Sequence, residues 1–475
     1  MAPPPLNLDD VQGDILIGLP KRLEAYWFIE IKKPSEFQKQ LLELIPLITS
    51  STQAKNDEKA CFDHRGNDGD LTLAGVNFAF SRKGLDELGF KEPLSKEPQN
   101  DPFEKTMLAT AEADFNDRVH GFNKAWFKEF KQEIHCLIFI TGDCQDTIDF
   151  TLAKVKKILG VTVQEIKLVQ GKVRPGDQMH HEHFGYNDGI SQPAIKGVDQ
   201  KLLPGQEFID QGIILLGRPG DRGQGRPSWT LDGSFLAFRY LSQEVPEFQD
   251  FVDDKNPHEA PKDFFGAQLV GRWKSGTPLV LAPTVDSDPS IGKNPQQNNK
   301  FDYDPHSQKL CPYAAHTRKT FPRGDIQQSV AIHRIVRRAI TFGEELTPEE
   351  IKSRKTKLDR GLLFKCYQSN IADGFHFIQR IWANNNTFPF LKIGEDGKPI
   401  PKPGFSDENG PGVDGIIGQA EKGGVRQMDI LNDNDPAGKV KLPKEWVISR
   451  GGEYFFSPSI SQLKKKFASP SKNEL

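Results

Sequence analysis

Cysteine is scarce in this chain of 475 residues, and the pattern of the few that occur excludes one kind of site. Five cysteines lie far apart, at positions 61, 136, 144, 311 and 366. No C-x-x-C pair and no C-x-x-C-H heme attachment motif is present. Covalent heme attachment through such a motif is therefore excluded, and any heme would be bound non-covalently.

Long hydrophobic runs and a dominant charge are also absent. No stretch approaches the roughly 18 uninterrupted apolar residues of a spanning helix, and the opening Met-Ala-Pro-Pro-Pro lacks the layout of a signal peptide. With 62 basic and 65 acidic residues and a net charge of −3, the chain has no basic run suited to nucleic acid. We therefore expect a soluble protein that acts on small molecules, with no membrane or nucleic-acid partner. A mature secreted enzyme would look the same.

The length predicts two packed domains or one large duplicated unit. In the first half, strand patterns at 25–32, 71–80, 134–141 and 163–169 alternate with helical spacing at 37–45 and 147–159. This order describes a ferredoxin-like α+β unit. The second half repeats it, with strands at 234–241, 329–342, 362–367 and 453–456 and helices at 245–252 and 374–384. We predict domains at 1–205 and 206–475, whose sheets pack together or close into a barrel.

Three histidines and a glutamate crowd the segment from His180 to His183, which suggests a zinc site at first sight. Adjacent histidines on a regular strand cannot both face one ion, and the glycines that follow indicate a turn. Asp188, between Asn187 and Gly189, reads as part of that turn unless a partner lies elsewhere. A zinc hydrolase stays open as one alternative.

A possible partner for Asp188 is His316, which follows two alanines that would let a flat macrocycle approach the backbone. Arg318 and Arg323 lie shortly after it, and their guanidinium groups suit the carboxylates at the edge of a heme. Arg337 stands in a β-branched strand, where an inward charge would be costly without an anionic ligand. Strand alternation sends Arg337 and Arg338 to opposite faces.

Six ordered blocks along the chain carry a family resemblance. They are the segments that begin at Val11, His316, Arg337, Gly361, Phe377 and Arg450, and they accompany the G-x-x-D-G motif at Gly185. The sequence resembles the dye-decolorizing peroxidases, most closely their fungal branch, nearly from end to end. The resemblance implies a duplicated ferredoxin-like α+β barrel with non-covalent heme b in the C-terminal half.

The resemblance also implies roles for single residues. His316 matches the proximal ligand of the heme iron, with Asp414 as the candidate acceptor behind its other nitrogen. Asp188 matches the distal acid-base residue, and Arg337 matches the distal arginine that stabilises developing charge. An aspartate has a reference pKa of about 3.9, so this assignment predicts an acidic optimum for dye oxidation.

Further positions match residues that control access and electron transfer. Leu362 and Phe364 match residues that narrow the peroxide route, and Trp382 matches a surface tryptophan that relays electrons from bulky dyes. A core position for Trp382 is the alternative. Phe342 replaces a tyrosine found in some relatives, which excludes a tyrosine relay there, and Phe321 replaces an asparagine beside the heme pocket.

The acidic cluster around Thr347 has two interpretations. Four glutamates, at positions 344, 345, 349 and 350, could bind manganese. A solvated helix start after Thr347 is the favoured interpretation, because glutamate is stabilising near a helix N-terminus.

Together these features predict an extracellular heme peroxidase. It would use hydrogen peroxide to oxidise dyes, phenols and lignin-like aromatics in one-electron steps. The alternative from another class is a heme-binding or iron-release protein with incidental peroxidase activity.

Overall fold

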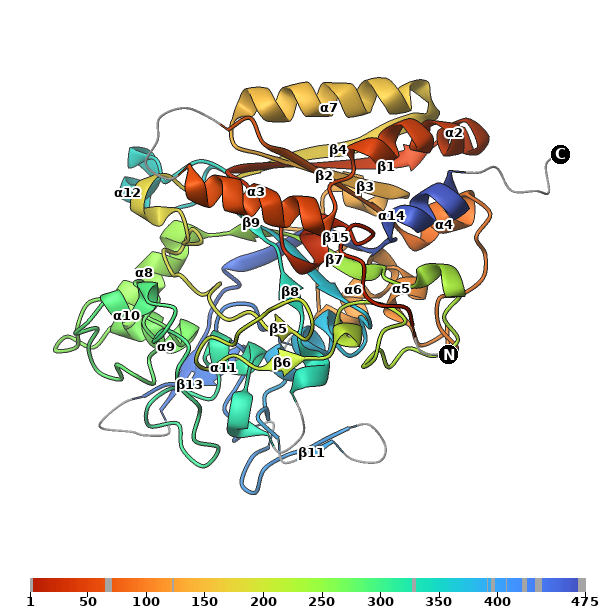
Figure 1. The fold of residues 1–475 in the computed structure, drawn as a ribbon. Coiled ribbons are helices and arrows are strands. Elements are labelled where there is room, and N and C mark those ends of the chain that lie inside the picture. Colours follow the sequence, from red (N-terminus) through yellow and green to blue (C-terminus); the bar gives the residue numbers. More distant parts are fainter. Residues whose placement is uncertain are drawn as a thin grey trace.

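One nine-stranded antiparallel sheet organises the molecule (Figure 1). Its order is β4-β1-β3-β2-β15-β7-β10-β8, and β9 pairs with another part of β10. The strands are β1 (Leu23–Ile31), β2 (Ala74–Phe80), β3 (Cys136–Gly142), β4 (Val163–Lys172), β7 (Ser234–Gln243), β8 (Val336–Arg337), β9 (Ile340–Phe342), β10 (Gly361–Gln368) and β15 (Val447–Ser457). This computed structural model describes residues 3–64, 71–121, 124–326, 330–390, 392–393, 398–406, 408–420, 425–431 and 438–468.

The two halves of the sheet repeat one topology. The first half has the order β4-β1-β3-β2, and the second has the matching order β15-β7-β10 followed by β8 and β9. β15 joins them, pairing with β7 along its length and with β2 at Phe456 opposite Phe80. At the far edges, the Thr341 hydroxyl of β9 donates to the Lys172 carbonyl of β4 at 2.6 Å. The sheet therefore curves round on itself, and the predicted ferredoxin-like α+β barrel is confirmed.

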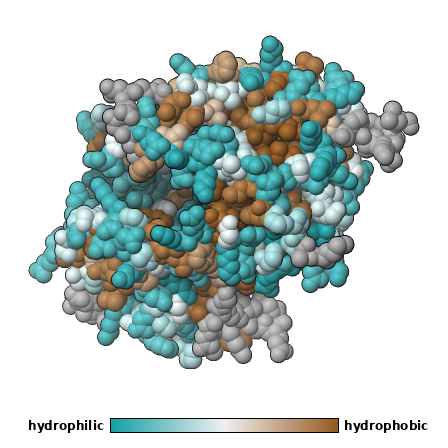
Figure 2. Space-filling view, viewed as in Figure 1, coloured by the Kyte–Doolittle hydropathy of each residue, from teal (hydrophilic) through white to brown (hydrophobic). Residues whose placement is uncertain are grey.

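Helices cover the outside of the first half as their apolar spacing predicts. α2 (Pro34–Leu44) and α7 (Gln145–Leu159) lie side by side over β1 and β3 (Figure 1). Phe37 and Leu41 of α2 and Ile148 and Val155 of α7 are buried on the inward faces. In the second repeat, α8 (Val245–Lys255) follows β7 in the chain as α2 follows β1. The surface seen in Figure 2 is largely hydrophilic with scattered apolar patches.

The core runs through both halves without a break. Tyr26 and Phe28 of β1 pack against Phe238 of β7, with ring centroids 5.2 and 5.0 Å apart. One hydrophobic cluster holds residues of both repeats. The division at 205 and 206 stays a prediction, because the elements on its two sides share this core.

Many of the shorter helices and strands lie in the irregular lower part of Figure 1, below the sheet. The remaining helices are α1 (Gly13–Leu16), α3 (Ser51–Asp63), α4 (Arg82–Glu87), α5 (Pro102–Lys105), α6 (Met107–Phe115), α9 (Phe264–Val270), α10 (Ser290–Lys293), α11 (His316–Thr320), α12 (Pro348–Ser353), α13 (Phe375–Phe377) and α14 (Ile460–Gln462). Short strands are β5 (Ala194–Ile195), β6 (Phe208–Ile209), β11 (Lys392–Ile393), β12 (Pro399–Ile400), β13 (Gln427–Asp429) and β14 (Lys439–Lys441). Within the described ranges, no helix combines the length and apolar character needed to cross a membrane.

One predicted strand is wrong in its extent. From position 330 on, the expected strand over 329–342 is a 3-10 turn at Ala331–His333 followed by the short strands β8 and β9, and position 329 lies outside the described residues. β-branched residues favoured one continuous strand, but only Val336 to Arg337 and Ile340 to Phe342 pair with β10. This interruption places Arg337 at the margin of the sheet, beside the candidate site.

Candidate functional site

His316 begins α11 and presents one ring nitrogen to a cavity. Its Nδ1 lies 2.8 Å from Oδ2 of Asp414, which is fully buried. The other carboxylate oxygen of Asp414 accepts from the backbone N–H groups of Ile416 and Ile417 at 2.8 and 2.9 Å. The structure therefore places the candidate acceptor directly behind His316, and Nε2 is left for a ligand on the cavity side.

The contact between His316 and Asp414 also controls their charges. Burial opposes the charged form of each group, but their mutual attraction outweighs it. The pKa of His316 is raised and the pKa of Asp414 is lowered. Asp414 is therefore a fixed anion that orients the imidazole and increases its electron density.

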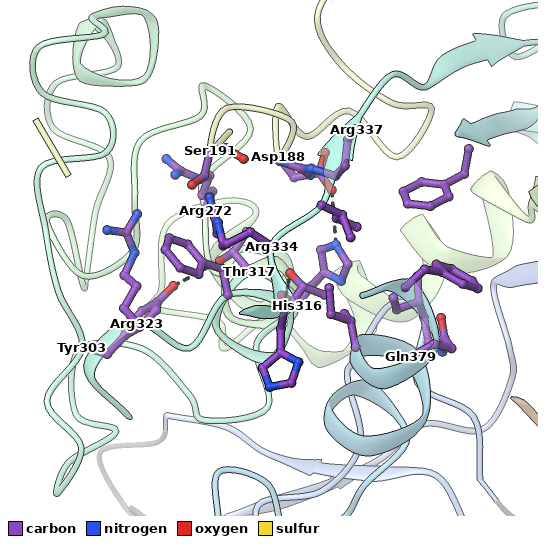
Figure 3. Close-up of a pocket in the computed structure, with 18 of the residues that line it drawn as sticks. Asp188, Ser191, Arg272, Tyr303, His316, Thr317, Arg323, Arg334, Arg337 and Gln379 are labelled. Atoms are coloured by element: carbon purple, nitrogen blue, oxygen red, sulfur yellow. Dashed lines mark hydrogen bonds and ion pairs between the residues drawn. The ribbon is translucent and has the colours of Figure 1, made fainter. Parts of the chain in front are cut away.

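Asp188 lies opposite His316 on a loop after β4. Its Oδ2 is 3.6 Å from Nε2 of His316, and Figure 3 shows the imidazole pointing towards this carboxylate and the nearby Arg337. Gly185, at φ +96°, permits the tight turn that leads to Asp188. The two residues that sequence analysis paired, 128 positions apart in the chain, meet at one point.

Glu182 holds the turn that carries Asp188. Its two carboxylate oxygens accept from the N–H groups of Tyr186 at 2.9 Å and Phe184 at 2.8 Å, and Gln243 donates a further bond. Burial, and secondarily the charge of Asp188, raises the pKa of Glu182 to about 7. Sequence analysis had placed Glu182 only in a possible metal cluster.

The histidines on either side of Glu182 have structural partners. Nε2 of His181 lies 2.9 Å from the Lys274 carbonyl, and Nε2 of His183 lies 2.8 Å from the Phe342 carbonyl. In the described part of the chain, no group of three His, Cys, Asp or Glu residues could hold a metal ion. The zinc alternative through His180, His181 and His183 therefore has no structural support.

Arg337 reaches the same space from β8. Its Nη2 donates to the Ser191 carbonyl at 2.7 Å, on the loop that carries Asp188. Arg338 turns to the opposite face and donates to the carbonyls of Asp14 and Leu16, each at 2.8 Å. The predicted alternation of the two arginines is confirmed.

Two cavities meet at His316 and Asp188. The larger, of about 1180 Å³, is lined by Asp188, Arg337, Leu362 and Phe364 among others. The smaller, of about 110 Å³, is the pocket drawn in Figure 3, and both His316 and Asp188 line both spaces. Their contact therefore lies at the boundary, and a flat group placed between the two side chains requires this contact to lengthen.

Arginines give the smaller cavity a strongly cationic lining. Arg272, Arg323 and Arg334 line it together with Arg337, and Asp188 is the one carboxylate in the lining. The Nε atoms of Arg272 and Arg334 are buried and have no hydrogen-bond partner among the described residues, although Arg334 Nε lies 3.7 Å from a carboxylate oxygen of Glu207. Unsatisfied buried donors of this kind fit the carboxylates of a heme edge.

The predicted pair of cofactor arginines needs one correction. Arg323 lines the small cavity, but Arg318 does not. Nε and Nη2 of Arg318 donate to Asp325 at 2.7 Å each, and its Nη1 donates to the Cys311 carbonyl. Because Arg318 lies outside the lining and its donors fix α11 within the protein, Arg272 and Arg334, which line the cavity, replace it as candidate carboxylate ligands. Arg334 stands three residues before Arg337 in the same arginine-rich stretch, and this position could have indicated its role from the sequence.

Phe321 contributes to this lining, as its departure from related sequences suggested. The guanidinium carbon of Arg334 lies 3.6 Å from the Phe321 ring centroid, and that of Arg323 lies 4.8 Å from it. The ring thus packs against two of the arginines and orients them.

Trp382 is not a surface residue, so its predicted placement is wrong. Only 1% of it is exposed, in the π-helical turn Ile378–Ala383. Its ring lies 5.1 Å from His333, 5.4 Å from Phe388 and 5.5 Å from Phe377, measured between centroids. These aromatic contacts bury the face of the helix that carries it, which was the alternative interpretation.

The acidic cluster around Thr347 includes the start of a helix, which was the favoured interpretation of its sequence. Thr347 and Glu350 make a capping box at α12, and Glu350 also pairs with buried Arg360 at 2.7 Å. Glu345 pairs with Arg174, and Glu349 pairs with Lys357. Because these carboxylates already have cationic partners, the structure gives no support to a manganese site here.

Known proteins resemble this chain over nearly its whole length. Residues 10–175 match the DyP dimeric alpha+beta barrel domain, and residues 281–389 match the C-terminal domain of Dyp-type peroxidases. A dye-decolorizing peroxidase of Mycena epipterygia is 38% identical over 96% of this chain and 86% of its own length. An ancestral D-type dye-decolorizing peroxidase is 46% identical, with a TM-score of 0.88 over 98% of this chain and all of its own. A dye-decolorizing peroxidase in complex with 2,6-dimethoxyphenol, 37% identical, has a TM-score of 0.84 over 98% of this chain and all of its own.

Proposed function

Because the chain belongs to the dye-decolorizing peroxidases, a family of heme enzymes, we propose that it binds heme b non-covalently and oxidises dyes, phenols and lignin-like aromatics with hydrogen peroxide. The observation that carries this proposal is the line Asp414, His316, Asp188, with Arg337 beside Asp188. A buried anion, an imidazole and a carboxylate in this order suit a metal ligand facing an acid-base group.

The residues of the two cavities would hold the cofactor. Nε2 of His316 is the candidate iron ligand, and Arg272, Arg323 and Arg334 are candidate partners for the carboxylates. Bound heme would supply the redox chemistry, which is two-electron reduction of peroxide and one-electron oxidation of the aromatic substrate. The protein supplies proton transfer, charge stabilisation and access.

Asp188 is proposed as the acid-base residue. As a carboxylate it can take the proton from one peroxide oxygen and return it to the other, which makes water the leaving group. Arg337 adds a fixed positive charge where the hydroperoxide anion and the separating charge develop. Both groups line the same cavity, so neither needs a large movement to act.

Leu362 and Phe364 are proposed to narrow the route to Asp188, because both line the larger cavity on β10. Aromatic substrates too large for this route would stay outside the cavity and pass their electrons inward through the protein. Trp382 is proposed as a buried relay, since it contacts His333, which lines the smaller cavity. Secretion, expected from the fungal resemblance, is part of the same proposal.

The test is an absorption spectrum of the purified protein with heme, followed by steady-state oxidation of a dye by peroxide. We expect a Soret band and saturable turnover, with Asp188→Asn lowering kcat/KM for peroxide by at least about a hundredfold. His316→Ala should lose heme during gel filtration. A protein that takes up no heme contradicts the proposal, and efficient iron release with slow, non-saturating turnover favours the heme-binding alternative.

A further inference from the structure

The backbone of Arg337 has an unusual partner. β8 is an edge strand, and Arg337 stands opposite Cys366 of β10, with the next ladder bond running from the Arg338 N–H to the Lys365 carbonyl at 2.7 Å. The N–H and C=O of Arg337 point away from β10, where an edge strand is normally unpaired. Both groups are instead satisfied by the side chain of Gln192.

The Gln192 amide binds Arg337 in two directions. Its Oε1 accepts from the Arg337 N–H at 3.2 Å, and its Nε2 donates to the Arg337 carbonyl at 2.9 Å. A primary amide is the side-chain group that can donate and accept in this way, like a strand backbone. Gln192 thus takes the place of a neighbouring strand at one residue.

Gln192 belongs to the loop that carries Asp188, four positions earlier. The preceding residue, Ser191, accepts from Nη2 of Arg337 at 2.7 Å. The carbonyl of Gln192 accepts from Nε2 of Gln206 at 3.1 Å, which fixes the loop from its other side. Three hydrogen bonds therefore connect Arg337 to the Asp188 loop, two of them through one side chain.

We propose that Gln192 is a positioning residue that sets the distance and orientation between Asp188 and Arg337. The inference rests on the proposed function of these two residues. Proton transfer by Asp188 and charge stabilisation by Arg337 must act on one small peroxide molecule, and a misplacement of about 1 Å can cost about a hundredfold in rate. No other described contact ties the backbone of Arg337 to this loop.

The experiment compares Gln192→Met, Gln192→Glu and the control Gln211→Met in the heme-loaded protein. Methionine keeps the length and loses both hydrogen bonds, whereas glutamate can accept but cannot donate to the Arg337 carbonyl. Gln211 is also half-buried and donates from Nε2 to a backbone carbonyl, that of Lys196 at 3.0 Å, away from Arg337. We expect both Gln192 variants to lower kcat/KM for peroxide by about ten- to a hundredfold. The kcat/KM of the Gln192 variants for a small phenol should change less than about twofold. Both kcat/KM values of the control Gln211→Met should also change less than about twofold.

A double-mutant cycle with Arg337→Gln separates positioning from general damage. If Gln192 acts through Arg337, Gln192→Met should change kcat/KM for peroxide less than about twofold in the Arg337→Gln background. The dissociation constant of fluoride, read from the heme absorption band, should rise in Gln192→Met and not in the control. This binding readout does not depend on turnover.

The outcomes distinguish the inference from the function on which it rests. Additive effects of the two substitutions, or equal losses with peroxide and with phenol, overturn the role of Gln192 while leaving Arg337 in place. An Arg337→Gln variant with unchanged peroxide kinetics overturns the role proposed for Arg337, and with it the inference about Gln192. If Gln192→Met fails to fold, Gln192→Glu carries the same comparison, because it keeps the shape of the side chain and the accepted hydrogen bond while it loses the donated one.

Discussion

Buried carboxyl groups outside the active site make the stability of this protein depend on pH. Glu453 on β15 is 8% exposed and accepts from the N–H groups of Met107 at 2.9 Å and Tyr454 at 2.7 Å. Burial outweighs these bonds and raises the pKa of Glu453 from 4.5 to about 7. The folded protein therefore holds a proton that the unfolded chain releases at lower pH.

We predict that Glu453→Gln makes the protein less sensitive to rising pH. A raised pKa contributes stability that is fully present below the unfolded value and is lost as pH rises through the folded value. Between about pH 4.5 and pH 7, the free energy of unfolding of the wild type should fall by up to about 3 kcal/mol relative to that of the variant. Urea unfolding of both proteins across this range measures the difference. A constant difference would show that Glu453 does not titrate in this window.

Single residues of the site were predictable to different degrees. Asp188, His316, Arg337 and Asp414 stand in blocks that carry the family resemblance or were named beside them, and the structure brings them together. Arg272 lies far from every such block. The pairing of the Gln192 amide with an edge strand could not be predicted either, because hydrophobic periodicity carries no information on contacts between side chain and backbone. Trp382 was misplaced because an amphipathic helix does not show which side of it other segments cover.

At the scale of elements, β10 shows how a strand can serve two purposes. Phe364 faces the cavities, whereas the next residue, Lys365, faces a buried charge cluster on the other side. Nζ of Lys365 lies 2.6 Å from Asp14 and 2.6 Å from Glu24, and all three side chains are fully buried. Burial opposes ionisation of Asp14, but its cationic neighbours outweigh it and lower the pKa of Asp14 to about 2.

We predict that Lys365→Met destabilises the protein by about 3–5 kcal/mol, because it leaves two buried carboxylates without their shared partner. Urea unfolding measures the loss. The control is Lys196→Met, which removes a pair of similar length, 2.7 Å to Asp210, between half-exposed side chains. That substitution should cost less than about 1 kcal/mol. Similar losses in both variants would contradict the role given to burial.

Helices and strands were predicted best where the apolar residues follow a clear helical or strand spacing. β1, α2 and α7 follow their apolar spacing within a few residues of the expected bounds. α3 was not predicted, because its sequence is mostly polar and its inner face buries small or polar residues such as Ser51, Ala54 and Asp57. The strand expected over 329–342 was too long, because residue preference alone does not show where a partner strand ends.

For the whole molecule, the shared core predicts one cooperative unit. Rings of β1 and β7 interlock across the barrel, and β15 is paired with strands of both halves. We predict that peptides from β1 and β10 lose protection from hydrogen exchange at the same urea concentration. Mass spectrometry of the heme-loaded protein measures this. Earlier unfolding of β1 would instead support the boundary at 205 and 206 as one between independent domains.

The position of β15 in the chain has a consequence for biosynthesis. A ribosome makes this strand after every other strand of the nine-stranded sheet, yet it lies in the middle, between β2 and β7. Until Ser457 has left the exit tunnel, the second half of the sheet lacks its fourth strand, and the edge of β7 that β15 covers stays open. The first half already has its four strands and meets β15 at Phe456 opposite Phe80, so the barrel is completed when this last strand is inserted beside β7.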